Sequence, residues 1–348
     1  RIPLPPLPEQ YRIVARIEEL FTKLDAGVKS LKTVKAQLKR YRQSVLKSGF
    51  EGKLTDEWRR THQDELEPAS RLLQRVREEP RRKAEKGKEL LQADTTNLPE
   101  LPQGWMWTRV GEVAKRIQYG SSEKATEDSS GVPVLRMGNI QEGNLVFEDL
   151  KYFPNDDPKL KDFLLEPQDV LFNRTNSAEL VGKTAVYEHW HPRAAFASYL
   201  IRVKVNPEVY DPHVLAFYIN SYYGRRYIAS VISQQVGQAN VNGAKLSAMP
   251  VPLTSLPEQK MIAEEIKRHL SIAHEIEKTV VNSLYQSEKL HQSILKRAFE
   301  GKLASQDPTD EPASALLERI RLLKTQIGHH RKTRKMKRPN DLRQEGLM

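Results

Sequence analysis

Apolar residues recur every three or four positions through residues 8–48, which predicts one long helix. Their average spacing is about 3.5 residues, typical of a coiled-coil seam rather than of a broad core-facing stripe. The seam consists of Val14, Ile17, Phe21, Leu24, Val28, Leu31, Val34, Leu38, Tyr41 and Val45. Residues 257–299 keep the same frame with a weaker seam, because Ser283, Ser287 and His269 stand at expected apolar positions. Each helix would be about 60 Å long, and we expect the two to pack antiparallel against each other.

The two helices belong to an internal duplication. "PLPPLPEQ" (3–10) and "PLTSLPEQ" (252–259) are 249 positions apart, and so are "LKSGFEGKL" (46–54) and "LKRAFEGKL" (295–303). A second echo pairs "EPASRLLQRVR" (67–77) with "EPASALLERIR" (311–321) at an offset of 244. A repeat of only two long copies is not a solenoid. It indicates one structural unit used twice, with a different domain between the copies.

The segment between the copies has a different sequence pattern, typical of strands rather than of a long helix. β-branched and aromatic runs alternate with turn residues, and they are "VPVLRM" (132–137), "DVLF" (169–172), "KTAVY" (183–187) and "SYLIRVKV" (198–205). One helix is predicted at 212–230, and another ahead of the loop at 118–131. The fold class predicted is α+β, with one mixed α/β domain of about 150 residues flanked by two long helices.

The predicted domain boundaries follow from these changes in sequence pattern. Residues 1–54 hold the end of a preceding domain and the first long helix, and 55–98 form a charged helical linker broken at Pro68 and Pro80. Residues 99–254 are the middle domain, 255–303 the second long helix, and 304–348 a helical and then basic tail. The tail could touch nucleic acid or simply be solvated. Since the chain starts at Arg1 in the middle of a repeat unit, we expect a fragment.

Composition and charge limit the classes of partner and of chemistry that this chain can have. The net charge of +11 and a pI near 9.5 favour a polyanionic partner, nucleic acid above an anionic membrane. There is no cysteine, so disulfides, thiolate metal sites and thiol nucleophiles are excluded. No apolar run approaches the roughly 18 residues of a membrane span, and we expect a cytoplasmic protein. No phosphate-binding loop, nucleophile elbow, zinc helix or Asn-Pro-Pro-aromatic methyltransferase signature is present, so we expect no catalysis by this chain.

Three polar, turn-rich loops of the middle domain are the candidates for recognition: 118–131, 172–183 and 233–246. Their Arg, Lys, Asn, Gln and Ser side chains are those that contact phosphates and base edges. We assign phosphate contacts to Lys124, Lys183 and Arg202. Base reading is assigned to Gln118, Tyr119, Ser121, Arg174, Asn176 and Gln238. Asn240 and Asn242 fit recognition or simple turn formation equally well.

The order of several motifs resembles one family. A domain with "LPQGWMWTRVGEV" (101–113), "PVLRMGNIQEGNL" (133–145), "LEPQDVLFNRTNSAELVGKTAVY" (165–187) and "QANVNGAKLSAMPVPLTSLPEQKMIAEEI" (238–266) is similar to the target recognition domain of type I restriction–modification specificity subunits. The "LPEQ", "FEGKL" and "EPAS" blocks look like that family's two conserved helical regions. No single motif is decisive, but their order is highly specific.

The resemblance implies the layout recognition domain, conserved helix, recognition domain, conserved helix. The helices would act as a ruler between two domains that each read a half-site of duplex DNA. This chain would hold one complete recognition domain; the missing one, or the pairing of two chains, would restore a two-part target. The implied partners are modification subunits, which methylate adenine with S-adenosylmethionine, and a restriction subunit driven by ATP. Cofactors, including Mg, are expected only in those partners. The conserved helices would carry the docking surface for the modification subunits.

Two rival hypotheses belong to other classes. A coiled-coil scaffold with a protein-binding middle domain would explain the seams but not the basic charge. A methyltransferase–nuclease sharing this recognition module would need a neighbouring catalytic segment.

Overall fold

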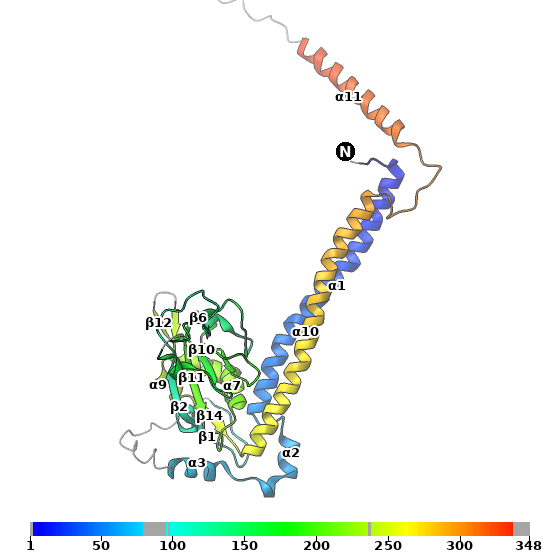
Figure 1. Cartoon of the computed structure of the whole chain (residues 1–348). Coiled ribbons are helices and arrows are strands. Elements are labelled where there is room, and N and C mark those ends of the chain that lie inside the picture. The colour runs from blue at the N-terminus through cyan, green and yellow to red at the C-terminus, as the bar shows by residue number, and fades with distance from the viewer. Residues whose placement is uncertain (1–2, 79–94, 97, 157, 236–237, 337–348) are drawn as a thin grey trace, which may run out of the picture. The chain divides into compact units, whose positions relative to one another are not determined.

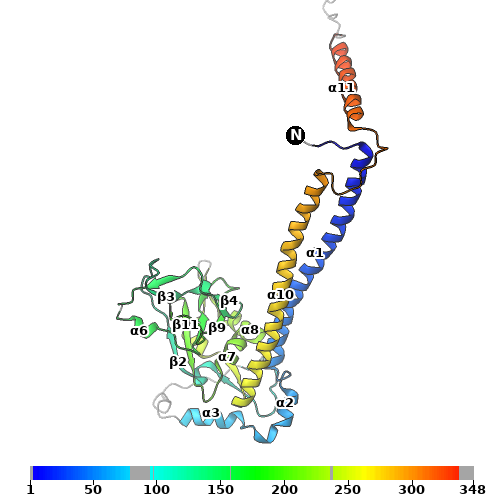
Figure 2. The same ribbon diagram turned by 45° about the vertical axis from the view of Figure 1, so that its right-hand side comes forward.

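The computed structural model describes residues 3–78, 95–96, 98–156, 158–235 and 238–336. The chain forms two compact units, one of residues 1–37 with 276–348 and the other of residues 38–275. Two 44-residue helices, α1 (Leu7–Phe50) and α10 (Leu256–Phe299), contribute to both units (Figures 1 and 2). The prediction of two long helices is confirmed to within a few residues at each end.

In the unit of residues 38–275, the end of α1 packs against the start of α10. The Tyr41 hydroxyl lies 2.6 Å from Nδ1 of His269, and their rings meet edge to face. Further along, a Cβ at Gly49 would lie only 2.9 Å from Cδ1 of Ile266, so the glycine lets the helices approach closely. Rising residue numbers on α1 meet falling numbers on α10, and the predicted antiparallel packing is confirmed.

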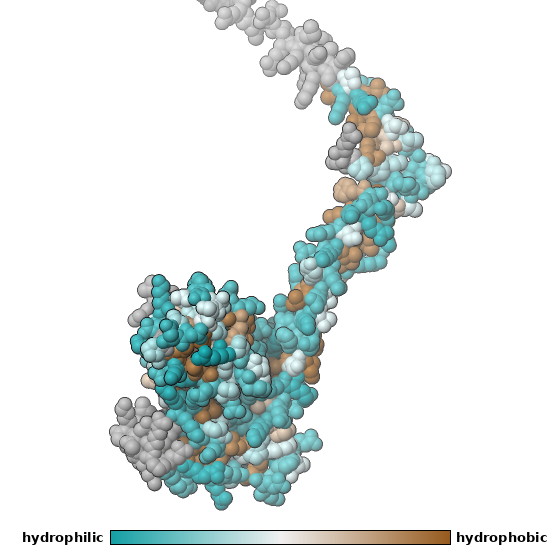
Figure 3. Space-filling view, in the orientation of Figure 1, coloured by the Kyte–Doolittle hydropathy of each residue, from teal (hydrophilic) through white to brown (hydrophobic). Residues whose placement is uncertain are grey.

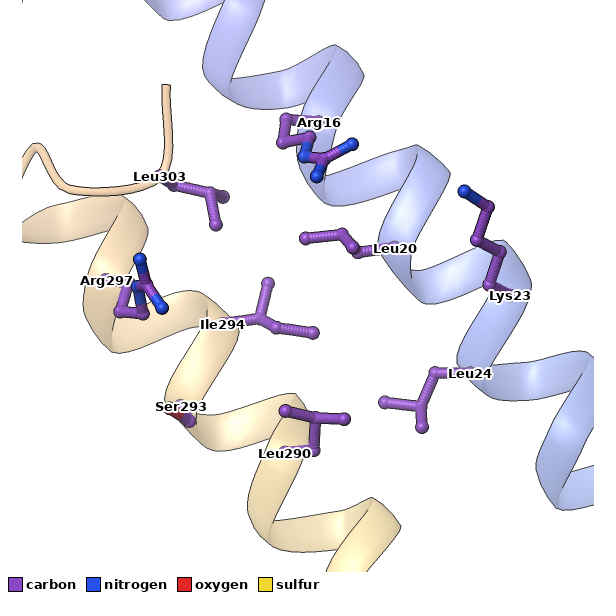
Figure 4. A pocket seen from close by; sticks show the side chains of 9 residues that line it. All are labelled: Arg16, Leu20, Lys23, Leu24, Leu290, Ser293, Ile294, Arg297 and Leu303. Carbon is purple, nitrogen blue, oxygen red and sulfur yellow. The ribbon is translucent and has the colours of Figure 1, made fainter. Parts of the chain in front are cut away.

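In the unit of residues 1–37 and 276–348, the other halves of α1 and α10 pack in the same sense. The Phe21 and His291 rings are 4.7 Å apart, and Nε2 of His291 lies 3.3 Å from a carboxylate oxygen of Asp25. Leucine and isoleucine side chains meet between the helix ends around a cavity of about 530 Å³ (Figure 4). The cavity is lined by Arg16, Leu20, Lys23, Leu24, Leu290, Ser293, Ile294, Arg297 and Leu303.

Further helices follow each long helix. After α1 come α2 (Asp56–Thr61), the 3-10 helix η1 (Gln63–Glu65) and α3 (Ala69–Glu78). After α10 comes α11 (Ala313–Met336). The part of the predicted linker beyond Glu78 falls largely outside the described residues. The predicted basic run begins within α11, which continues to Met336, and residues 337–348 lie outside the described part of the chain. Among the described helices, none is both long and apolar enough to cross a membrane.

The middle domain is built on a four-stranded antiparallel sheet of order β2-β11-β7-β9. These strands are Ala114–Tyr119, Leu200–Val205, Val170–Asn173 and Thr184–Val186. A second sheet has the order β10-β3-β6, with strands Ala195–Phe196, Val132–Leu135 and Lys151–Phe153. A third has the order β12-β13-β8, with strands Ser233–Gln235, Gln238–Asn240 and Thr175–Asn176. All four predicted strand runs contain a strand.

Two smaller pairs and several short helices complete the domain. The strand β1 (Met106–Arg109) pairs with β14 (Pro250–Leu253), so the beginning and end of the domain lie side by side. A hairpin joins β4 (Ile140–Gln141) to β5 (Asn144–Leu145). The short helices are α5 (Val110–Val113), η2 (Met137–Asn139), α6 (Leu160–Phe163) and α9 (Gly243–Ser247).

The single helix predicted at 212–230 is wrong, because the segment forms α7 (Pro212–Asn220) and α8 (Tyr222–Val231). Ser221 between them is extended and begins α8, with its hydroxyl accepting a bond from the Gly224 N–H. The corner is tight: a Cβ at Gly224 would lie 2.4 Å from the Tyr218 carbonyl. The loop at 118–131 likewise follows a strand, β2, rather than a helix, since α5 has only four residues.

The core of the middle domain extends into the helices around it. One continuous cluster of buried side chains joins the sheet to Phe50 of α1, Leu72 of α3 and Ile266 of α10. The predicted segment 99–254 therefore does not bury its core alone. The end of α1, the start of α10 and α3 all contribute side chains to the core of the middle domain.

Candidate nucleic-acid interface

The candidate site lies where three loops meet at one end of the four-stranded sheet. Tyr119 ends β2 opposite Ile201, and Asn173 ends β7 opposite Leu200. The loops at 118–131 and 172–183 therefore leave the sheet at the same end, from the two strands that flank β11. The third loop, 233–246, joins them because its strand β13 pairs with β8, directly after Arg174.

Arg174 links all three loops. Its backbone N–H donates to the Tyr199 carbonyl at 3.0 Å, and its carbonyl accepts from the Val241 N–H at 2.9 Å. Its guanidinium donates to the Ser198 carbonyl and to Oδ1 of Asn240, both at 3.2 Å. The same guanidinium lies 5.0 Å from the centre of the Tyr119 ring, a cation–π contact.

The partners of Arg174 are themselves held. The Tyr119 hydroxyl accepts a 2.6 Å hydrogen bond from the Gly243 N–H, so the ring connects the first loop to the third. Asn240 donates from Nδ2 to the Thr175 hydroxyl at 2.9 Å, which fixes its amide with Oδ1 toward Arg174. We call Tyr119, Arg174 and Asn240 the loop hub. Its bonds fix the relative positions of the loops before any ligand is present.

Tyr119 of the loop hub and three further large side chains on these segments, Met137, Leu180 and Tyr199, are more than a third exposed. Hydrogen bonds place Met137 and Tyr199 at the end of β7. The buried Asn173 side chain donates to the Met137 carbonyl at 3.0 Å, and Arg174 donates to that of Tyr199. Exposed apolar and aromatic groups at this place suit thymine methyl groups and the stacked faces of bases.

The other predicted residues near the hub have mixed placements. Lys124 and Gln238 are exposed, whereas Lys183 and Asn176 are half-buried. Asn176 pairs across the sheet with Ala239, which keeps it beside the third loop. Together with Tyr119 and Arg174, these four residues lie on the three converging loops. They remain predicted contacts.

Ser121 is placed differently from the prediction. Only 4% of it is exposed, and its hydroxyl accepts a 3.1 Å bond from the Glu123 N–H within its own loop. Its backbone bridges two neighbours, donating to the Phe196 carbonyl and accepting from the Ser198 N–H. In this conformation Ser121 shapes the loop and does not face a ligand, so we withdraw it from the base-reading set.

Arg202 is also withdrawn from the phosphate contacts, because it is buried. It pairs with the Asp169 carboxylate at 3.2 Å and donates to the Leu164 carbonyl at 2.7 Å. Gln118 accepts from the same guanidinium and donates to the Asp162 carbonyl, so it serves this internal network too. Burial raises the pKa of the Asp169 carboxyl, against the opposing effects of the Glu166 N–H and Arg202. Side chains on one strand alternate between faces, and Arg202 therefore faces away from its neighbour Ile201.

The two asparagines left open by the sequence separate clearly. Asn242 begins α9 and accepts the Lys245 N–H at 2.9 Å, a local turn role. Asn240 belongs to the loop hub. No sequence signal distinguishes them, because both stand among glycines in one polar loop. Among the described residues, no group of three or more His, Asp or Glu side chains is placed to hold a metal ion.

Residues 102–286 match the family described as type I restriction modification DNA specificity domain, which covers more than half of the chain. The chain belongs to this family. It is 26% identical over 344 residues to the EcoKI specificity subunit of Escherichia coli K12, covering 96% of this chain and 66% of the relative. The StySPI specificity subunit of Salmonella potsdam is 25% identical, with the same coverage of both chains. The chain thus spans just under two thirds of the length of these relatives.

Solved structures agree on the fold. A chain from a type I restriction–modification system, studied for complex assembly and conformational transition, matches with a TM-score of 0.61. The match covers 86% of this chain and 61% of the other, at 19% identity. The predicted family and the predicted α+β class are both confirmed.

Proposed function

We propose that the chain is the DNA-reading part of a specificity subunit and that its middle domain recognises one half of a two-part target in duplex DNA. The observation that carries this proposal is the convergence of three loops on the hub of Tyr119, Arg174 and Asn240, within a basic chain. Family membership supports the same function over that of a protein-binding scaffold. The most direct test is to select bound sequences from a random duplex library with the purified chain. We expect the protein to act on DNA in the cytoplasm.

Arg174→Ala should weaken binding to the selected half-site by about 1–3 kcal/mol, the scale of a base-specific contact. The loss has two physical sources, since the guanidinium carries charge and also holds the loops together. Fluorescence anisotropy with selected and scrambled duplexes measures both affinity and discrimination. Arg71→Ala is the control, because Arg71 is exposed on α3, away from the loops. Unchanged discrimination in the Arg174 variant would remove Arg174 from the reading set.

The rival scaffold function makes a different prediction about salt. Binding to DNA releases counterions, so the logarithm of affinity should fall linearly with the logarithm of salt concentration, at about 0.9 per phosphate neutralised. A scaffold that binds a protein through an apolar face has no such steep dependence. The titration on the intact chain therefore separates the two functions without knowledge of the target sequence.

We further propose that catalysis belongs to partners: modification subunits that use S-adenosylmethionine and a restriction subunit that uses ATP and Mg. The unit of residues 1–37 and 276–348 offers a surface that suits docking of the modification subunit. Val281, Tyr285, Leu295 and Phe299 are all exposed, and their spacing places them on one face of α10. Figure 3 shows hydrophobic residues among hydrophilic ones along the long helices. Such exposure is typical of interaction sites.

Replacing Val281 and Tyr285 together by aspartate should abolish co-purification with the modification subunit of the same system. Both side chains are already in water, 45% and 58% exposed, so the free chain should lose little stability. The matched control is Gln286→Asp, a charge added on the neighbouring exposed position. Co-purification that survives the double substitution would move the docking surface elsewhere.

The second half of the two-part target would need a second recognition domain, and the repeat of α3 in α11 offers a place for it. In α3 the residues Ala69, Leu72, Leu73 and Val76 are 1–2% exposed, buried in the core that the middle domain shares. Their counterparts in α11 at the 244-residue offset are Ala313, Leu316, Leu317 and Ile320. Of these, Leu317 and Ile320 are 42% and 38% exposed, although the repeat preserves their apolar character. We propose that this face of α11 receives another domain of the same kind in the assembled subunit.

A further inference from the structure

The helix α1 carries a one-signed charge run that its pairing with α10 does not require. Between Asp25 and Glu51 there is no acidic residue, while seven lysines and arginines fall in the same stretch. They are Lys29, Lys32, Lys35, Lys39, Arg40, Arg42 and Lys47. Exposed helix faces normally mix both signs, because alternating charges at three and four residues stabilise a helix.

Four of these residues form a continuous line, which we call the lysine stripe: Lys29, Lys32, Lys35 and Lys39. Their spacing of three, three and four residues keeps them on one side of the helix. All four are exposed, and within the described residues none of them pairs with an acidic side chain. Like charges three and four residues apart repel one another and destabilise an isolated helix. A bound polyanion would offset this repulsion, so we expect the stripe to bind one.

The duplication supplies an internal comparison. At the 249-residue offset, the counterparts of the lysine stripe on α10 are Lys278, Val281, Leu284 and Glu288. The counterpart segment as a whole, 275–299, has four basic and three acidic residues, against seven and none in α1. Both helices keep the apolar seam, so pairing of the helices does not explain the stripe. It is specific to α1.

We propose that the lysine stripe binds the phosphate backbone of duplex DNA outside the sequence that the middle domain reads. The inference rests on the proposed function, because it needs the chain to engage DNA. Along the axis, ten residues of helix span about 15 Å, the length of four to five base pairs at about 3.4 Å per pair. Lysine suits the task, since its ammonium is a point charge on a flexible stem that binds phosphate without reading sequence.

The stripe would add affinity but not selectivity. Phosphate contacts position a protein on the duplex and carry no sequence information of their own. A specificity subunit that also grips the unread DNA would hold its target tightly while each reading domain makes only a few base contacts. The stripe therefore predicts a salt dependence steeper than the middle domain alone would give.

The test compares two fourfold variants of the intact chain on a random-sequence duplex of about 40 base pairs. In the first, Lys29, Lys32, Lys35 and Lys39 become glutamine. In the second, glutamine replaces the α10 lysines Lys267, Lys278, Lys289 and Lys296, which are equally exposed but stand within four positions of acidic residues. Affinity is measured by anisotropy between about 50 and 300 mM KCl. Circular dichroism melts confirm that both variants keep their helices.

Each lysine that contacts a phosphate contributes about 0.9 to the slope of log affinity against log salt. Loss of the stripe should lower the slope by about 2 to 3.6, and the α10 variant should lower it by less than about 1. Discrimination between selected and scrambled half-sites should stay unchanged in the stripe variant. A stripe variant with the parent's slope would overturn the proposal and leave an acidic protein as the partner of this face. If the parent chain bound no duplex DNA at any salt concentration, the proposed function itself would fail.

Discussion

Glu258→Ala should destabilise the chain by about 3–5 kcal/mol, the cost of breaking a buried hydrogen-bonded ion pair. Glu258 is 1% exposed, and its carboxylate accepts bonds from four residues in three separate segments of the chain. They are Thr55 and Arg59 after α1, Trp105 at the start of the middle domain, and Thr254 before α10. Alanine would leave the Arg59 Nε–H and the Trp105 indole N–H without their acceptor.

Urea denaturation followed by circular dichroism measures the loss. The matched control is Glu264→Ala, on the same helix but exposed, which should change stability by no more than about 0.5 kcal/mol. Glu258→Gln should fall between the two, because one amide oxygen still accepts a bond while its NH₂ group faces existing donors. Equal midpoints for the Glu258→Ala and Glu264→Ala variants would show that this junction does not hold the domain to the helices.

The parts of the fold that were predictable from sequence are those with periodic patterns. The seam of α1 and the β-branched runs at β7 and β11 each repeat a local preference often enough to fix the element. The break at Ser221 has no such signal, since its cause is the tight packing of Gly224 on the preceding turn. Nor could the sequence show that α3 is part of the domain's core, because that burial depends on a partner far along the chain.

The candidate site shows the same division. Loop composition singled out the three segments that hold Tyr119, Arg174 and Asn240, and the structure shows that hydrogen bonds join these segments. It failed for Arg202 and Gln118, which alternate to the opposite side of their strands and serve an internal network. Residue type alone does not distinguish an exposed arginine that is available to bind phosphate from a buried one that donates to carbonyl groups. The distinction requires the strand register, which depends on contacts across the sheet.

Leu73→Ala should cost about 2–5 kcal/mol of stability, because the leucine is buried and its removal leaves a cavity in the shared core. Leu317→Ala, its counterpart in the repeat, should cost no more than about 0.5 kcal/mol in this chain. The contrast tests whether the same apolar helix is covered in one copy and uncovered in the other. Urea midpoints of the two variants, compared with the parent chain, provide the measurement.

The same pair of substitutions tests the proposed second recognition domain. In a longer chain that carries such a domain, Leu317→Ala should become destabilising by a similar amount, since its side chain would then be buried as Leu73 is. Arg77 donates to the Glu112 carboxylate of the middle domain at 2.7 Å, and its counterpart in the repeat is Arg321. Arg321→Glu should therefore weaken seating of the second domain, and a lysine at that domain's equivalent of Glu112 should restore it. A Leu317 variant equally stable in both contexts would mean that α11 faces something other than a recognition domain.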